Sequence, residues 1–180
     1  MKIIPIEIPD LLIIQPTVFR DNRGSFFESY NKKTLETKGF YADFVQDNQS
    51  ISHKNVMRGL HFQQPPFAQG KLVRVVVGSA LDVAVDIRKS SPFYGKHVMI
   101  ELNAKENTMF WIPEGFAHGF VALEDHTILH YKVNNYYNKN AEATLLWNDK
   151  DLNINWNTSN PIVSEKDQEG LSFKDFISPF

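Results

Sequence analysis

Residues 71–88 read KLVRVVVGSALDVAVDIR, and this stretch decides the fold class. Two runs rich in Val and Leu flank Gly78-Ser79, a glycine-first pair that is typical of a two-residue β-hairpin turn. The pattern therefore predicts two antiparallel strands joined by a tight turn. The register that follows pairs residue 77 with 80, 75 with 82, and 71 with 86.

The two faces of this hairpin are expected to differ, because successive side chains point to opposite sides of a strand. The apolar face would hold Leu72, Arg74, Val76, Leu81, Val83, Val85 and Ile87. The other face would place Lys71 near Asp82 and Asp86, beside Val73, Val75 and Ala84. This mixture of charged and apolar side chains is compatible with a solvent-exposed surface and equally with the floor of a polar cleft.

Turn signals recur at short intervals along the rest of the chain. They lie at Arg23-Gly24, Gln64-Pro65-Pro66, Ser91-Pro92 and Pro113-Glu114-Gly115. Short runs of Val, Ile, Phe and Tyr between them predict an all-β sandwich or barrel. One short helix is expected over Asn31–Gly39, and a second with Ser164 as its cap. At 180 residues without a linker, residues 1–180 are expected to form a single domain.

Composition narrows the classes of function. The chain has 19 Lys and Arg against 21 Asp and Glu, a net charge of −2, which predicts no bulk attraction to nucleic acid or to an acidic membrane. The absence of Cys excludes thiol nucleophiles, disulfides and cysteine metal sites. The N-terminal stretch MKIIPIEIPDLLII is broken by Pro and acidic residues, unlike a signal peptide, and no apolar run approaches the length of a membrane span. A cytoplasmic protein is expected.

Neither a metal site nor a phosphate loop is written in the local sequence. The six His residues form no His-x-His or His-Glu-x-x-His motif, and only His126 and His130 are four apart, in a segment that reads as a strand. Such spacing does not converge on a strand. The glycine motifs that cradle phosphates are also missing.

Four residues are candidates for chemistry, and each taken alone has a structural reading that is at least as good. His61 is either a base that titrates near neutral pH or a hydrogen-bonded core histidine. Lys71 is either an oxyanion stabiliser or a solvated strand end, and Tyr131 is either a proton donor or a ring in the barrel wall. Asp167 reads locally as an acid in the first turn of a helix. Strict alternation puts Arg58 on the face opposite His61, unless the intervening glycine hosts a bulge.

Taken together, the segments resemble the dTDP-4-dehydrorhamnose 3,5-epimerases. The segments that carry the resemblance are RGLHFQ at 58–63, QGKLVRVV at 69–76, LDVAVDIR at 81–88, WIPEGFAHGF at 111–120, YK at 131–132 and SEKD at 164–167. The resemblance runs from Phe19 to Asp167. It implies a cupin-like β jelly roll, a homodimer, no cofactor or metal, and epimerisation at C3 and C5 of dTDP-4-dehydro-6-deoxyglucose in the supply of dTDP-rhamnose.

The resemblance also implies roles for individual residues. His61 matches the family's base, Asp167 the carboxylate that orients it, Lys71 the cation beside the enolate, and Tyr131 the acid on the opposite face. Positions that hold the sugar nucleotide are matched by Phe19, Arg23, Glu28, Gln46, Asp47, Asn48, Arg58, Lys71, His118, Tyr137, Glu142 and Lys166. Arg23 and Glu28 are expected to act across the dimer interface.

Three alternatives remain open from the sequence. A 3-only or 5-only epimerase of another deoxysugar would use the same base, acid and lysine. A 3,4-ketoisomerase is disfavoured because the segment around His61 has the epimerase form Arg-Gly-Leu-His-Phe. A metal-dependent cupin or a non-catalytic sugar-nucleotide binding module belongs to a different class, and metal analysis would distinguish it.

Overall fold

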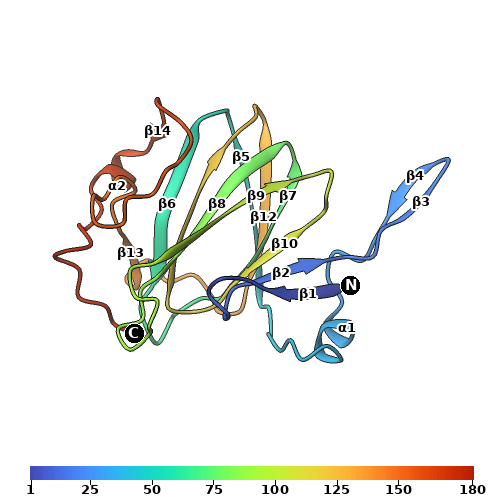
Figure 1. Cartoon of the computed structure of the whole chain (residues 1–180), viewed down its shortest axis with the longest axis horizontal. Coiled ribbons are helices and arrows are strands. Elements are labelled where there is room, and N and C mark those ends of the chain that lie inside the picture. The colour runs from blue at the N-terminus through green and yellow to red at the C-terminus, as the bar shows by residue number, and fades with distance from the viewer.

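The computed structural model describes all 180 residues and shows two antiparallel sheets packed face to face (Figure 1). The first sheet has six strands in the order β1 (Lys2–Pro5), β2 (Leu12–Gln15), β10 (Met109–Ile112), β7 (Lys71–Val77), β12 (Thr127–Val133) and β5 (Gln46–Ser52). The second has the order β13 (Glu142–Thr144), β6 (Val56–Gln63), β11 (Phe116–Ala122), β8 (Ser79–Asp86) and β9 (His97–Asn103), with β14 (Ile162–Val163) parallel to β6. This jelly roll confirms the predicted all-β, cupin-like class.

Two helices and one hairpin lie outside the sheets. Helix α1 (Lys32–Glu36) begins after Asn31, whose side chain accepts a hydrogen bond from the Thr34 amide. Helix α2 (Glu165–Gln168) begins after Ser164, whose hydroxyl caps the Asp167 amide. Both helices were predicted, and the cap predicted at Ser164 is confirmed. Strands β3 (Phe19–Asp21) and β4 (Gly24–Phe26) form a hairpin that projects from the body. Neither helix is long and apolar enough to cross a membrane.

The predicted hairpin of residues 71–86 is wrong. Strand β7 pairs with β10 and β12 in the first sheet, whereas β8 pairs with β11 and β9 in the second. Gly78 is therefore the point where the chain crosses between sheets; its φ is +77°, and a Cβ there would lie 2.6 Å from the Thr127 hydroxyl. A Gly-Ser pair is compatible both with a tight hairpin turn and with a crossing between sheets. The crossing forms here because β7 and β8 pair with strands that are distant in the chain.

The two predicted sets of alternating side chains do lie on opposite faces, but those faces belong to two different sheets and not to one hairpin. Val73, Val75 and Ala84 face the core between the two sheets, and Lys71 and Asp82 point into the same space from opposite sheets. The residues assigned to one apolar face lie on two outer faces instead. Leu72 packs under α1 on the first sheet, while Val83 packs under the C-terminal segment on the second.

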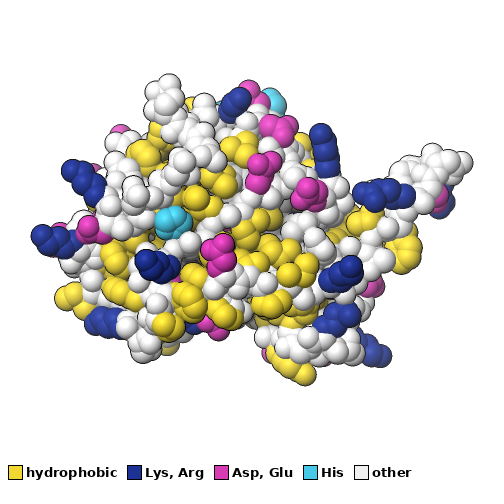
Figure 2. Space-filling view, in the orientation of Figure 1, with side chains coloured by type: hydrophobic (Ala, Val, Ile, Leu, Met, Phe, Trp, Pro, Cys, Tyr) yellow, Lys and Arg dark blue, Asp and Glu magenta, His cyan; other side chains and the backbone are white.

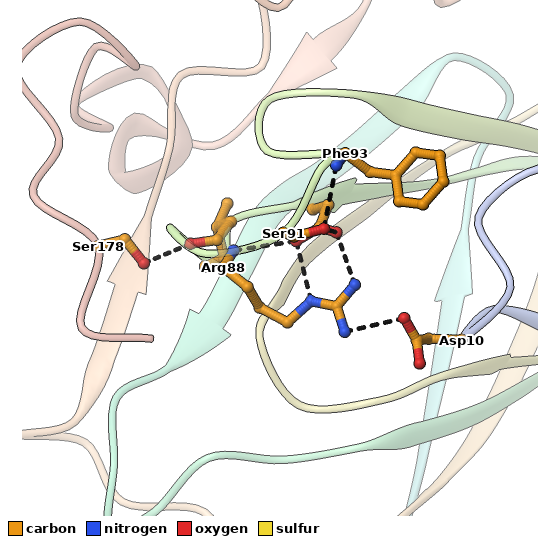
Figure 3. A network of polar contacts seen from close by, with 7 residues as sticks. Asp10, Arg88, Ser91, Phe93 and Ser178 are labelled. Atoms are coloured by element: carbon orange, nitrogen blue, oxygen red, sulfur yellow. Dashed lines mark hydrogen bonds and ion pairs between the residues drawn. The ribbon is translucent and has the colours of Figure 1, made fainter.

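A polar network closes the jelly roll where the C-terminal segment meets β8 (Figure 3). Asp86 is fully buried, and its carboxylate accepts hydrogen bonds from Arg88 at 2.6 and 3.0 Å and from Ser91 at 2.6 Å. Arg88 also pairs with Asp10 at 2.9 Å, and Ser178 donates to the carbonyl of Ile87. Asp86 is one of the two carboxylates predicted near Lys71, and it pairs with Arg88 instead.

Candidate active site

A cavity of about 540 Å³ lies between the two sheets, with residues of β14 and α2 in its wall. Its volume is within the usual range for small-molecule sites. Seven residues singled out from the sequence line it, namely Arg58, His61, Lys71, His118, Tyr131, Lys166 and Asp167. Segments that are far apart in the chain thus bring their reactive side chains to one place.

His61 and Asp167 form a close pair in this cavity. His61 Nε2 lies 2.6 Å from Asp167 Oδ1, and the Asp167 side chain is only 4% exposed. Burial raises the pKa of Asp167, but hydrogen bonds from His61 and from the Gly59 amide outweigh it, so the pKa lies below its ordinary value. A carboxylate held in this way fixes the proton of a neutral imidazole on Nε2. The lone pair of Nδ1 is then free to act as a base.

Arg58 reaches the same cavity as His61 because of an irregularity at Gly59. On β11 the partner of His61 is His118, whereas the partner of Arg58 is Phe120, so the register shifts between them. Gly59 has a φ of +131°, and a Cβ there would lie 2.5 Å from a backbone atom of β11. Strict alternation would have put Arg58 and His61 on opposite faces, and the bulge that the sequence allowed at this glycine turns both toward one pocket.

Lys71 and Tyr131 face His61 from the opposite sheet. Lys71 is 8% exposed, and its Nζ donates to the carbonyl oxygen of His61 at 3.2 Å. Burial lowers the pKa of Lys71 to about 8, against the attraction of Asp82 and Glu142. Burial also raises the pKa of Tyr131, so its phenol keeps the proton at neutral pH. The cavity thus holds the imidazole of His61 and the phenol of Tyr131 on facing walls, with the Lys71 ammonium between the sheets.

His118 is fixed by a second carboxylate. Its Nε2 lies 2.9 and 3.0 Å from the two carboxylate oxygens of Asp82, which is fully buried. Burial lowers the pKa of His118 more than Asp82 raises it, so the ring is neutral near pH 7 and donates Nε2–H to the carboxylate. Of the two carboxylates predicted near Lys71, Asp82 is the one whose negative charge raises the pKa of Lys71 against the effect of burial.

A second group of predicted residues is linked at the end of β13. Glu142 accepts from Lys166 at 2.6 Å and from the Tyr137 hydroxyl at 2.9 Å. Burial raises the pKa of Glu142, but these two contacts outweigh it and lower the pKa. The Gln46 side chain accepts from the Tyr137 amide and donates to Asn48 at 2.8 Å. These residues form a polar group joined to the cavity through Lys166.

Four predicted residues lie away from the cavity. Asp47 pairs with Lys132 at 2.9 Å, away from the cavity. Phe19 and Arg23 are on the projecting β3–β4 hairpin, where Arg23 pairs with Asp21. Glu28 follows the hairpin and accepts from Asn31. Phe19 is 63% exposed, and Figure 2 shows the hairpin standing clear of the body.

Two polar residues of the cavity wall, Ser50 and Ser164, were not among the site residues predicted from the sequence, and Ser164 was predicted only as a helix cap. Ser50 lines the cavity beside Leu129 and Tyr131. The two-residue period of β5 could have found it, because Ser50 lies two positions after Asn48 and shares its face. No three His, Asp or Glu side chains stand together in a way that could hold a metal ion.

Comparison with known protein families gives one consistent match. A family model described as dTDP-4-dehydrorhamnose 3,5-epimerase matches residues 5–175. The dTDP-4-dehydrorhamnose 3,5-epimerase of Shigella flexneri is 54% identical over 176 residues, covering 97% of both chains.

Solved structures agree with the sequence comparison. The dTDP-4-dehydrorhamnose 3,5-epimerase of Bacillus anthracis, with TDP and PPi bound, superposes with a TM-score of 0.93 at 45% identity and covers 96% of this chain and 99% of its own. The dTDP-6-deoxy-D-glucose-3,5-epimerase of Legionella pneumophila, in complex with dTDP-4-keto-L-rhamnose, has a TM-score of 0.93 at 40% identity, covering 98% and 94%.

Proposed function

This chain belongs to the dTDP-4-dehydrorhamnose 3,5-epimerase family, and we propose that its cavity works with His61 as base, Tyr131 as acid and Lys71 as oxyanion stabiliser. The protein is an isomerase that inverts C3 and C5 of dTDP-4-dehydro-6-deoxy-D-glucose to give dTDP-4-dehydro-L-rhamnose. One observation carries the proposed roles. The His61–Asp167 pair, 2.6 Å apart, faces Tyr131 across a cavity that also contains Lys71.

Proton removal is the first step. His61 Nδ1 takes the proton from a carbon next to the C4 ketone, and the C–H electron pair forms a C=C bond as the carbonyl electrons move onto O4. Asp167 stabilises the imidazolium that results. The Lys71 ammonium lies where it can stabilise the enolate oxygen, an interaction that strengthens as charge develops.

Proton return from the opposite face completes the inversion. The Tyr131 phenol gives its proton to the same carbon as the enolate collapses to the ketone, and the configuration changes. Its raised pKa keeps the proton on the phenol until the carbanion needs it. His61 then loses its proton to solvent and Tyr131 regains one, and the same cycle operates on the second carbon.

We propose that the remaining residues hold the sugar nucleotide. Arg58 and Lys166 supply charged hydrogen-bond donors in the cavity wall, and cations suit a diphosphate. The neutral ring of His118 offers Nδ1 as an acceptor, because its Nε2–H is donated to Asp82. The exposed ring of Tyr137 offers a face on which a base can stack. The other substrate-binding residues of the proposal are Phe19, Arg23, Glu28, Gln46, Asp47, Asn48 and Glu142.

The position of the β3–β4 hairpin supports a homodimer in which each chain completes the site of its partner. Phe19 and Phe26 are 63% and 69% exposed on this arm, beside Arg23. Phe19 and Phe26 are paired across the two strands, and exposed apolar side chains that adjoin one another mark surfaces where proteins associate. We propose that Arg23 and Glu28 act in the partner's cavity, that residues 1–180 form a single epimerase domain, and that the enzyme works in the cytoplasm on nucleotide sugars made there.

Product analysis in heavy water tests the function. The protein is incubated with dTDP-4-dehydro-6-deoxy-D-glucose in D₂O, and the product is examined by proton NMR. Deuterium at both C3 and C5, with the L-rhamno configuration, is the expected result. Deuterium at one carbon only would mean a 3-only or 5-only epimerase. If the unmutated protein, with Lys71, His61 and Tyr131 intact, incorporated no deuterium at either carbon, the proposal would be refuted.

A further inference from the structure

Ser50 carries a hydroxyl that no group of the protein uses. Its Oγ is shielded from solvent and is the only buried side-chain nitrogen or oxygen without a hydrogen-bond partner. Leaving a buried hydroxyl unpaired costs free energy, and such groups are rare in folded proteins. Ser50 also lines the cavity between the sheets. The unpaired group is thus at the site where a substrate brings its own donors and acceptors.

The neighbours of Ser50 on the same strand face are already engaged. Ser52 Oγ accepts from Arg58 Nε at 3.2 Å, and Asn48 Oδ1 accepts from Gln46 at 2.8 Å. Along the inner face of β5 only the Ser50 oxygen is therefore free.

The position of Ser50 indicates which part of a ligand it would meet. Strand β5 pairs with β12 so that Ser50 is opposite Leu129, and Asn48 is opposite Tyr131. Ser50 is thus a diagonal neighbour of Tyr131, at a typical Cα separation of about 7–8 Å. It belongs to the wall that faces His61, where the proposed function places the reacting sugar.

We infer that Ser50 Oγ forms a hydrogen bond with a hydroxyl group of the bound sugar and so helps to select the sugar. Rotation about the Cα–Cβ bond between staggered rotamers turns the oxygen toward the cavity when the sugar binds. The inference rests on the proposed function, because it assumes that a sugar lies between His61 and Tyr131. Ser50 is a binding and specificity residue of that same site.

Binding of two ligands to Ser50→Ala tests this role by calorimetry. dTDP lacks the sugar, whereas dTDP-glucose has the C2 and C3 hydroxyls of the substrate but no ketone, so it binds without reacting. We expect Ser50→Ala to weaken dTDP-glucose about 3- to 10-fold, as for loss of one neutral hydrogen bond, and to leave dTDP within about 2-fold. Equal weakening of both ligands, or no change in either, would overturn the inference.

Thermal unfolding separates a ligand-binding role from a structural one. Because Ser50→Ala removes an unpaired buried hydroxyl, the ligand-free variant should melt at the wild-type temperature or above it. A structural serine would lower the melting temperature and the affinity together. The control is Ser79→Ala, which loses another buried hydroxyl, bonded to Glu124 at 2.7 Å, and should bind both ligands as wild type does.

Activity of the wild type distinguishes failure of the proposed function from failure of the proposed role of Ser50. Absence of epimerase activity in the wild type would refute the proposed function. An active wild type whose Ser50→Ala variant keeps full affinity for dTDP-glucose would refute only the role of Ser50.

Discussion

Replacing Lys71 by Met is expected to stabilise the protein while removing its activity. The ammonium is 8% exposed, and burial lowers its pKa from the ordinary 10.5 to about 8. At 1.36 kcal/mol for each pH unit, keeping this group charged in the folded protein costs about 3 kcal/mol. Loss of its hydrogen bond to the His61 carbonyl offsets about 1 kcal/mol. Met has a similar length and no charge, so Lys71→Met should gain about 2 kcal/mol near pH 7, or roughly 4–8 °C in Tm.

The pH dependence identifies the cause of the stabilisation. Between about pH 8 and pH 10.5 the unfolded chain keeps the Lys71 proton, while the folded chain has lost it. The unfolded state then binds more protons, so the stability of the wild type rises with pH across this window. The advantage of Lys71→Met should be full below about pH 8 and should disappear by about pH 10.5.

Urea unfolding of both proteins at about pH 7 and about pH 10 measures the effect, with kcat measured at the lower pH. Loss of an oxyanion stabiliser predicts a fall in kcat of about 100-fold or more. A Lys71→Met variant that is less stable than the wild type at about pH 7 would refute the reasoning. So would an advantage of equal size at both pH values, since burial of a charge could not produce it.

Three further predictions concern Lys71, Tyr131 and the ion pair of Arg88 with Asp86. First, kcat/KM should fall as pH rises through about 8, because Lys71 loses its proton there; a rate that stays level to about pH 10 would contradict this. Second, Tyr131→Phe should still exchange substrate protons with D₂O but form little inverted product, and an unchanged product yield on NMR would remove Tyr131 from the acid role. Third, Arg88→Met should lower the free energy of unfolding by about 3–5 kcal/mol, because Asp86 is left buried with its charge uncompensated. Asp10→Asn is the matched control in urea unfolding, since its half-exposed carboxylate should contribute less than about 1 kcal/mol; equal losses would show that burial of Asp86 is not the cause.

The sequence predicted the class of fold and the local elements better than the long-range pairing. Ser164 caps a helix as expected, because a cap depends on a few neighbouring residues. The error at Gly78 has a physical origin. Glycine permits positive φ in a hairpin turn and in a crossing between sheets alike, and the choice is made by packing against Thr127 and by strands far away in the chain.

In the candidate site, too, local features were predicted from the sequence better than contacts between distant segments. Alternation correctly put Lys71 and Asp82 toward one space, although they reach it from opposite sheets. Asp167, more than one hundred positions from His61, has no local signal beyond a helix start, and only resemblance to a family assigned its partner. The free hydroxyl of Ser50 could not be found from sequence, because an unpaired group is defined by all of its neighbours.

Deuterium exchange catalysed by His61→Ala tests the central claim most directly. The variant is incubated with dTDP-4-dehydro-6-deoxy-D-glucose in D₂O, and the signals of the protons at C3 and C5 are followed by NMR. If His61 removes both protons, neither signal should decay faster than in buffer without enzyme. Decay of either signal at the wild-type rate would mean that another group is the base.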